Sequence, residues 1–180
     1  MGGYMEIKGY KVFSEDGINR YGMKFEEGKK YHVDGTISFG NNGNGIHFCK
    51  RMEDTFRYFD AMNGNVKVAE VIGSGDIVEF NDEYYGYYEM YAASDLEVLK
   101  FLSREEIIEH FLNRNELFVC RFVSLFKLTD EEILLFKTKF FDNISVLKAI
   151  AYYQEKDLDV YSRESNKIYR KRKIVGEVNE

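Results

Sequence analysis

The glycines of this chain are confined almost entirely to its first half. Fourteen of the 15 glycines lie between Gly2 and Gly86, and none occurs from Tyr87 to Val175. Glycine allows the positive φ angles of tight turns and costs roughly 1 kcal/mol inside a helix relative to alanine. We therefore expect strands and turns first and helices afterwards. This division predicts an α+β protein, with a small, mostly antiparallel sheet and one helix followed by a C-terminal helical bundle.

The composition supports a folded chain and argues against two classes of partner. Of the 180 residues, 44% are hydrophobic and 31% are charged, which is enough apolar material for a core without disulfides. No apolar run approaches the roughly 18 residues of a membrane helix, so we expect no membrane association. The net charge of -6 disfavours nucleic acid as the main partner, because surfaces that bind DNA are normally basic. Cys49 and Cys120 are too few for a disulfide framework and suit a reducing compartment, so we expect a cytoplasmic protein.

The first half is predicted to be a β-rich domain at residues 1–93. Within it, short strands are expected where β-prone residues follow an alternating pattern and turn-forming residues stand at both ends. Asp34-Gly35 is the strongest hairpin dipeptide, and it is expected to join strands at 30–33 and 36–39. The other strands are expected at 9–13, 23–25, 46–49, 65–72 and 76–80. The segment Glu53–Met62 differs, because its apolar side chains recur at helical spacing and predict a helix.

Repeated capping sequences mark a helical region placed at residues 94–160. Ser94–Glu97, Ser103–Glu106 and Thr129–Glu132 each match the S/T-x-x-E capping box, in which hydroxyl and carboxylate bond to each other's backbone amides. Asn115 and Asn143 are weaker caps. Together these signals predict helices near 95–102, 104–113, 116–127, 130–141 and 144–156.

Phenylalanine is concentrated in two adjacent helices of this region. The six rings are Phe118, Phe122, Phe126, Phe136, Phe140 and Phe141. A chain of this size need not cover them all, and large exposed apolar patches usually mark interfaces. We therefore expect a homo-oligomer that associates through these helices, unless the rings fill an internal core.

The loop Gly40–Gly45 is the most distinctive segment of the first half. Its three glycines and three asparagines permit the close backbone approach that an anion-binding loop requires. The Lys-Ser/Thr of a P-loop is missing, however, and a strand is expected to follow. A flexible connection between strands is therefore the favoured interpretation.

His47 and Cys49 share one face of that following strand, because side chains repeat at every second residue. A tetrahedral zinc site would need two more ligands, and His32, His110 and Cys120 are isolated in the sequence. We therefore expect neither a metal nor a cofactor. The pair is placed beneath the helix that carries Phe56 and Phe59.

Two other clusters have both a functional and a structural interpretation. The tyrosines from Tyr84 to Tyr91 could stack on bases or sugars, but Asp82 and Glu83 beside them would repel phosphates, and strands around Gly86 explain them equally well. Arg170–Lys173 is the basic cluster of a polar tail at residues 161–180. A solvated tail is favoured, with at most weak contact to nucleic acid.

Four segments of the first half recur together in a known family: Lys8–Phe13, Tyr21–Tyr31, Gly45–Cys49 and Ala69–Val71. They resemble an uncharacterised bacterial and phage-associated domain, sometimes joined to pentapeptide repeats, whose hallmark is a Gly-Phe-His-Phe-Cys-like strand. The resemblance covers about residues 8–112 and implies no established activity. Ile46 stands where that family usually has an aromatic residue.

The segment Gly45–Cys49 followed by Tyr58 also resembles, more weakly, the second conserved block of ADP-ribosyltransferases. In that family a tyrosine stacks on nicotinamide, and Glu83 lies where the segment of the catalytic glutamate occurs. The resemblance implies a ligand site formed by His47, Tyr58 and Glu83. The first block of the family, a His or Arg on an early strand, has no match near Tyr10, and a shared outline does not fix a function.

We therefore predict a cytoplasmic, non-catalytic binding or self-association module of phage or mobile-element type. The alternative is an NAD-using enzyme that resembles ADP-ribosyltransferases. The two differ most directly in whether His47, Tyr58 and Glu83 line one shared cleft.

Overall fold

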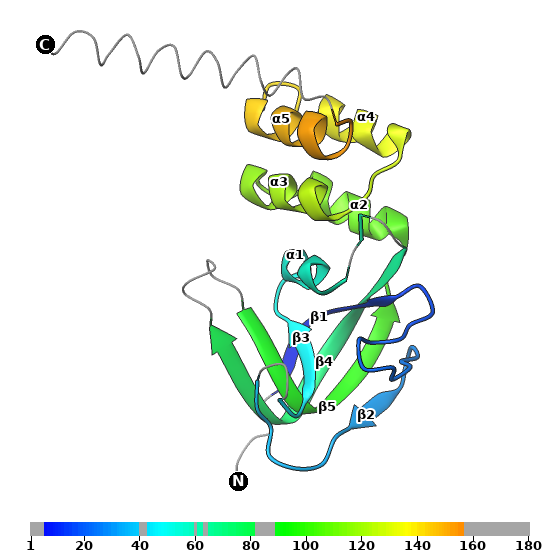
Figure 1. The fold of residues 1–180 in the computed structure, drawn as a ribbon, viewed down its shortest axis with the longest axis vertical. Coiled ribbons are helices and arrows are strands. Elements are labelled where there is room, and N and C mark those ends of the chain that lie inside the picture. Colours follow the sequence, from blue (N-terminus) through cyan, green and yellow to red (C-terminus); the bar gives the residue numbers. More distant parts are fainter. Residues whose placement is uncertain (1–5, 40–42, 60, 63–64, 82–88, 157–180) are drawn as a thin grey trace, which may run out of the picture. The chain divides into compact units, whose positions relative to one another are not determined.

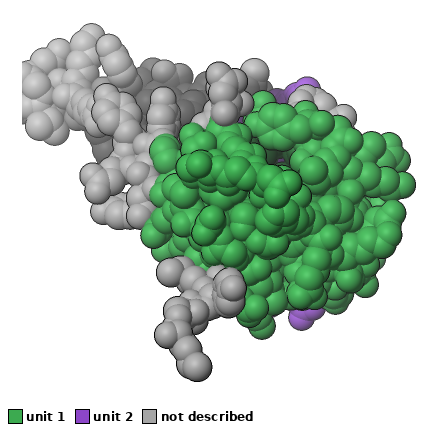
Figure 2. Space-filling model, turned by 90° about the horizontal axis from the view of Figure 1, so that it is seen from below, with its two compact units in different colours: residues 1–107 green, residues 108–180 purple. Residues whose placement is uncertain are grey.

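The computed structural model describes residues 6–39, 43–59, 61–62, 65–81 and 89–156 (Figure 1). The chain divides into two compact units, residues 1–107 and residues 108–180, which Figure 2 colours green and purple. The first unit contains the five strands of the described chain, and the second contains most of its helical residues. The α+β class predicted from the glycine distribution is therefore confirmed.

Antiparallel pairing joins the strands of the first unit into one sheet in the order β2-β5-β3-β1-β4. In addition, β4 pairs with β5 along most of its length. Because β1 pairs with both β3 and β4, and β3 also pairs with β5, these four strands close into a ring to which β2 is attached through β5. The strands are β1 (Ile7–Ser14), β2 (Lys30–His32), β3 (Ile46–Cys49), β4 (Val66–Asn81) and β5 (Glu89–Phe101).

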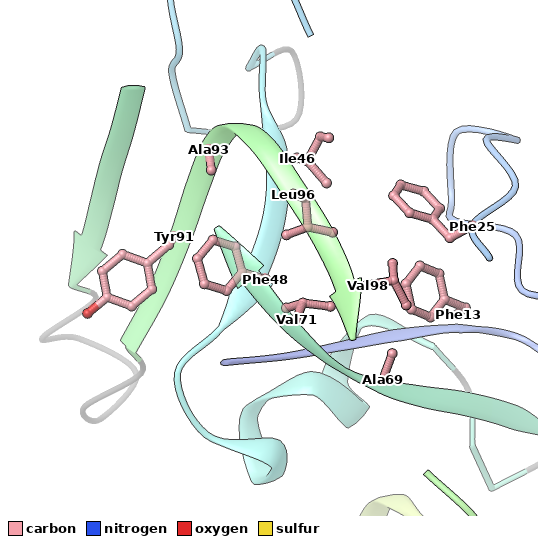
Figure 3. Close-up of a cluster of buried hydrophobic side chains, with 10 residues drawn as sticks. All are labelled: Phe13, Phe25, Ile46, Phe48, Ala69, Val71, Tyr91, Ala93, Leu96 and Val98. Atoms are coloured by element: carbon pink, nitrogen blue, oxygen red, sulfur yellow. The ribbon is translucent and has the colours of Figure 1, made fainter. Parts of the chain in front are cut away.

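Apolar side chains from all four strands of the ring form the core of the first unit (Figure 3). Phe48 of β3 is the closest neighbour of Gly73 on β4, where a Cβ atom would lie only 2.3 Å from the Cε1 atom of the ring. Glycine at this position therefore leaves the space that Phe48 occupies. The cluster consists of Phe13, Phe25, Ile46, Phe48, Ala69, Val71, Tyr91, Ala93, Leu96 and Val98.

A short helix follows β3, in the segment where the sequence predicts a longer one. It consists of α1 (Met52–Thr55) and a 3-10 turn, η1 (Phe56–Tyr58). The helix ends there because Phe59 adopts an extended conformation, with φ -136° and ψ 146°. Asp54 is completely buried and accepts a hydrogen bond from Nε of Arg51 at 3.0 Å.

The predicted helix at 95–102 is wrong, because these residues belong to β5. Ser94 does not cap a helix: its hydroxyl donates to Asp95 at 2.6 Å and accepts from the backbone N–H of Asp76 at 3.0 Å. Leu96 and Val98 are buried at alternate positions, as a strand requires. The first helix after the sheet therefore begins at Arg104 and not at Ser94 or Asp95.

The predicted hairpin at Asp34-Gly35 is also wrong. Residues 30–32 form β2, but they pair with β5 instead of with residues 36–39, which form no strand. The side-chain amide of Asn44 donates to the backbone oxygens of Asp34 and Thr36, at 2.7 and 3.4 Å. These bonds hold the segment as a loop. Residues 23–25 likewise form only an isolated bridge, between Ile18 and Lys24, instead of a strand.

The four predicted helices from residue 104 onward are confirmed: α2 (Arg104–Leu112), α3 (Glu116–Leu125), α4 (Asp130–Lys139) and α5 (Ile144–Tyr153). Ser103 and Thr129 form the expected capping boxes with Glu106 and Glu132. The side chains of Asn115 and Asn143 accept hydrogen bonds from the backbone of the first turns of α3 and α5. The capping sequences thus locate these helix starts to the residue.

Part of the phenylalanine cluster forms the core of the second unit. Phe122 stacks on Phe111 with ring centroids 3.8 Å apart, and it also contacts Phe126 and Phe136. Phe122, Phe126 and Phe136 are buried, whereas Phe118 and Phe140 are half-buried and Phe141 is 75% exposed. The buried amide of Gln154 completes this unit, because it donates to the backbone oxygen of Phe126 at 2.9 Å and accepts from the backbone of Leu128 at 3.0 Å.

Candidate functional site

A cavity of about 340 Å³ lies in the first unit, next to strands β1 and β3 and the α1–η1 segment. Most of its lining side chains are apolar or aromatic, and a few polar groups are placed among them. The lining residues are Tyr10, Lys11, Val12, Asn19, Arg20, Tyr21, Met23, Val33, Phe39, Gly43, Asn44, Gly45, Ile46, His47, Phe48, Cys49, Thr55, Tyr58 and Phe59.

Lys11 of β1 is one of two positively charged residues, with Arg20, that line this cavity. Its Nζ atom donates a hydrogen bond to the backbone oxygen of His47 at 2.6 Å, and it lies 5.6 and 5.8 Å from the ring centroids of Phe13 and Phe25. Burial of the ammonium group lowers the pKa of Lys11 from 10.5 to about 8, although the nearby Cys49 thiol opposes this effect. Lys11 is therefore still mostly charged at pH 7, in partly apolar surroundings.

His47 of β3 lies next to Lys11 and carries an unused ring nitrogen. The imidazole stacks on the ring of Phe39 with centroids 4.6 Å apart. Its Nε2 atom is buried and has no hydrogen-bond partner among the described residues. Burial, followed by the charge of Lys11, lowers the pKa of His47 below its usual 6.5. The imidazole is therefore neutral at pH 7 and can accept or donate a hydrogen bond.

Cys49 at the end of β3 and Tyr58 at the end of η1 also line the cavity. Cys49 is a buried free thiol, and the hydroxyl of Tyr58 donates to the sulfur of Met90. Burial, with a smaller contribution from Cys49, raises the pKa of Tyr58 to about 12. Tyr58 therefore stays protonated at physiological pH. Across the described ranges, no three His, Cys, Asp or Glu side chains are grouped closely enough to hold a metal ion.

The charges that line the cavity are opposite in sign to the charge of the chain as a whole. The chain has 31 acidic and 25 basic residues. The cavity lining nevertheless includes Lys11 and Arg20, and none of the described lining residues is Asp or Glu. Such a site attracts anions.

The structure brings two of the three predicted site residues together. His47 and Tyr58 both line the cavity, whereas Glu83 lies outside the described residues. The end of the predicted loop, Gly43–Gly45, also lines it, and Gly40–Asn42 lie outside the description, as do the tyrosines at 84–88 and the basic tail. His47 and Cys49 line the same cavity as Tyr58 and Phe59, and their predicted packing beneath the helix stays a prediction.

Lys11 was not predicted as a site residue. In a strand, Lys11 lies on the same face as Phe13, which is completely buried. A lysine on the core-facing side of an early strand is the sequence signal that would have identified it.

A second polar cluster lies on the surface where β2 pairs with β5. The two ring nitrogens of His32 bond to Asp95 at 2.8 Å and to Asp34 at 3.2 Å. These hydrogen bonds raise the pKa of His32, and the bond to Asp95 makes the largest contribution. Ser94 donates to Asp95 and not to His32, so this cluster lacks the hydrogen bond by which a histidine activates a serine.

Comparison with known sequence families matches residues 7–110 to a domain of unknown function (DUF7666). The chain has no significant match among curated proteins or among solved structures. The family description names neither a phage origin nor an ADP-ribosyltransferase, so both stay predictions. None of the helices in the described part of the chain has the length and apolar character needed to span a membrane.

Proposed function

This chain belongs to the DUF7666 family, whose description names no activity, and from its geometry we propose that its first unit is a binding domain for a small molecule. The observation that carries the proposal is the cavity of about 340 Å³ beside β1 and β3. Small-molecule sites typically have volumes of about 300–1,000 Å³ and are lined by apolar and aromatic groups with a few placed polar atoms. The cavity has both properties.

The polar groups of the cavity are held on regular secondary structure. Lys11 lies in the β1 ladder with β4, and His47 lies in the β3 ladder with β5. Binding groups on rigid elements need little reordering when a ligand arrives, which favours affinity. His47 and Tyr58 are neutral at pH 7, so they are suited to hydrogen bonding with a ligand.

Binding of an uncharged apolar dye tests this proposal. N-phenyl-1-naphthylamine fluoresces in apolar surroundings, and we expect saturable binding by the whole chain. Val33→Phe fills the cavity and should weaken binding at least fivefold, with unchanged circular dichroism. Leu134→Phe, at a residue of α4 in the second unit that is 65% exposed, is the matched control and should leave binding unchanged. Absence of dye binding, or equal weakening by Leu134→Phe, would exclude the cavity as the site.

A second candidate function is the use of NAD, because this alternative requires His47 and Tyr58 to lie on one cleft, and both line the cavity. It also requires a carboxylate that stabilises a positively charged ribose in the transition state, and Glu83 was predicted to supply it. Incubation with NAD and mass spectrometry for free nicotinamide test this candidate. Nicotinamide release that Tyr58→Ala abolishes would support it, and no release above the buffer rate would reject it.

We also propose that the second unit mediates self-association. Leu117 of α3 and Ile144 of α5 are 72% and 59% exposed, and Phe141 is 75% exposed. Asn143 donates to Glu116 at 3.0 Å, which brings the first turns of α3 and α5 together and places Leu117 and Ile144 beside this contact. Exposed apolar residues gathered in this way are typical of interfaces.

A further inference from the structure

The cavity contains a positive charge that its described surroundings do not balance. Lys11 donates to the backbone oxygen of His47 and lies near two aromatic rings. Among the described residues it has no carboxylate partner, and no described Asp or Glu lines the cavity. A partly buried ammonium without an anionic partner is unfavourable, because it loses hydration and gains little in return.

The ammonium group of Lys11 has N–H donors that remain available for a ligand. It carries three N–H donors, and the backbone oxygen of His47 takes one of them. A carboxylate or sulfonate could accept the others, and such charge-assisted hydrogen bonds are stronger than neutral ones. The exposed Arg20 adds a second positive charge to the lining of the cavity.

The rest of the lining determines what the anionic group is attached to. Val12, Val33, Phe39 and Phe59 present apolar surface to the cavity. This surface favours an aliphatic or aromatic body, because removing apolar area from water stabilises a complex. A polyphosphate would place several charges against this apolar surface and is disfavoured.

We propose that the ligand of the cavity is a small amphipathic anion, whose single acidic group pairs with Lys11 and whose apolar body occupies the remaining space. This inference rests on the proposed function, that the cavity binds a small molecule, and it names the chemical class of that molecule. The acid can be a carboxylate or a sulfonate, since both offer the same oxygen acceptors to an ammonium group.

Two dyes that differ only in an acidic group test this inference. 8-Anilinonaphthalene-1-sulfonate carries a sulfonate on the ring system of N-phenyl-1-naphthylamine. We expect the whole chain to bind the sulfonate at least tenfold more tightly at pH 7 and low salt. Lys11→Met should remove this preference, so that the two dyes bind this variant with similar affinity. Lys11→Arg, which keeps the charge, should retain most of it.

The results separate the two proposals. If the neutral dye does not bind, or binds equally to Val33→Phe, the proposed function fails. If the neutral dye binds in the cavity but the sulfonate is not preferred, or the preference survives Lys11→Met, the function stands and the inference about the anion is wrong. Displacement of the neutral dye by octanoate and by 1-octanol extends the test to carboxylates. Octanoate should displace it at a lower concentration than octanol in the wild-type chain, but not in Lys11→Met.

Discussion

The ring of Phe48 occupies the space that a side chain at residue 73 would need, since a Cβ atom there would lie 2.3 Å from its Cε1 atom. Phe48 is only 2% exposed, so its ring cannot move into solvent. We expect Gly73→Ala to lower the free energy of unfolding by about 1–3 kcal/mol through overpacking. Urea denaturation measures this loss.

A comparison with Gly9 identifies the cause of that loss. A Cβ atom at Gly9 would meet the Cδ2 atom of Phe48 at 2.8 Å but also the backbone oxygen of Cys49 at 2.3 Å, and a backbone atom in a sheet cannot move aside as a side chain can. A double-mutant cycle with Phe48→Leu should therefore recover much of the stability lost in Gly73→Ala and little of that lost in Gly9→Ala. Equal recovery in both would contradict the packing model.

Because the pKa of Lys11 is lowered, the free energy of unfolding should change with pH in the alkaline range. The unfolded chain holds the Lys11 proton up to about pH 10.5, whereas the folded chain releases it near 8. Between these values the unfolded state binds more protons, so stability rises with pH. The free energy of unfolding should rise by about 1–2 kcal/mol from pH 7.5 to 9.5, relative to Lys11→Met.

The pH profile of Lys11→Met must be subtracted from that of the wild type, because other titratable groups face Lys11 and also contribute to the profile. These are His47 and Cys49 of β3, with Tyr58 close to Cys49. The raised pKa of Tyr58 acts only above pH 10, outside the window. Parallel pH profiles for the wild type and Lys11→Met would show that the ammonium is well hydrated, contrary to the structure.

Two histidines of the first unit should have pKa values shifted in opposite directions from the usual 6.5. The hydrogen bonds that the protonated ring of His32 donates to Asp95 and Asp34 raise its pKa, and burial lowers the pKa of His47. His32 therefore stabilises the fold below pH 6.5, and this contribution is lost as the pH rises through its raised pKa. Proton NMR of the imidazole C–H signals measures both values. Asp95→Asn should lower the pKa of His32 and leave that of His47 in place.

Gln154 should be among the most sensitive polar residues of the second unit. It is only 5% exposed and bonds to the backbone of Phe126 and Leu128. Gln154→Leu leaves buried backbone groups without these partners and should lower the free energy of unfolding by about 2–4 kcal/mol. Glu155→Gln, which removes a surface ion pair with Lys137, should cost less than about 1 kcal/mol. Thermal unfolding of the two variants gives the comparison.

Self-association through the second unit should depend on Phe141, which is 75% exposed. Phe141→Asp should shift the chain toward monomer by placing a charge on the apolar surface. Thr138→Asp adds the same charge at an exposed polar residue of α4 and should have little effect. Sedimentation velocity from low to high micromolar concentration measures both. A wild-type chain that is monomeric throughout would refute this part of the proposal.

The sequence predicted the helices wherever a local signal decides the structure. The capping boxes at Ser103 and Thr129 are complete in the structure. The same pattern at Ser94 failed because Leu96 and Val98 also alternate as in a strand, and pairing with β4 and β2 decides between the two. That pairing joins residues that are far apart in the chain, and a local sequence pattern contains no information about such partners.

The residues of the candidate site were likewise only partly predicted, because the site depends on contacts between distant parts of the chain. His47 and Tyr58 were predicted from a family resemblance, and both line one cavity with Lys11. The pairing of β1 with β3 places Lys11 and His47 on neighbouring strands, and the turn η1 that follows β3 carries Tyr58. Lys11 was missed because lysine in a short strand is usually solvated, and its burial depends on β3 lying beside β1.

The order in which the strands appear along the chain also bears on how the protein is made. In the described sheet, β1, β2 and β3 each pair with β4 or β5, the last two strands. A ribosome releases the chain from its N-terminus, so the first three strands emerge before the partners that complete their ladders exist. The sheet cannot close until Phe101 has left the exit tunnel. During synthesis the nascent first half therefore exposes to water the phenylalanines Phe13 and Phe48, which the finished sheet buries.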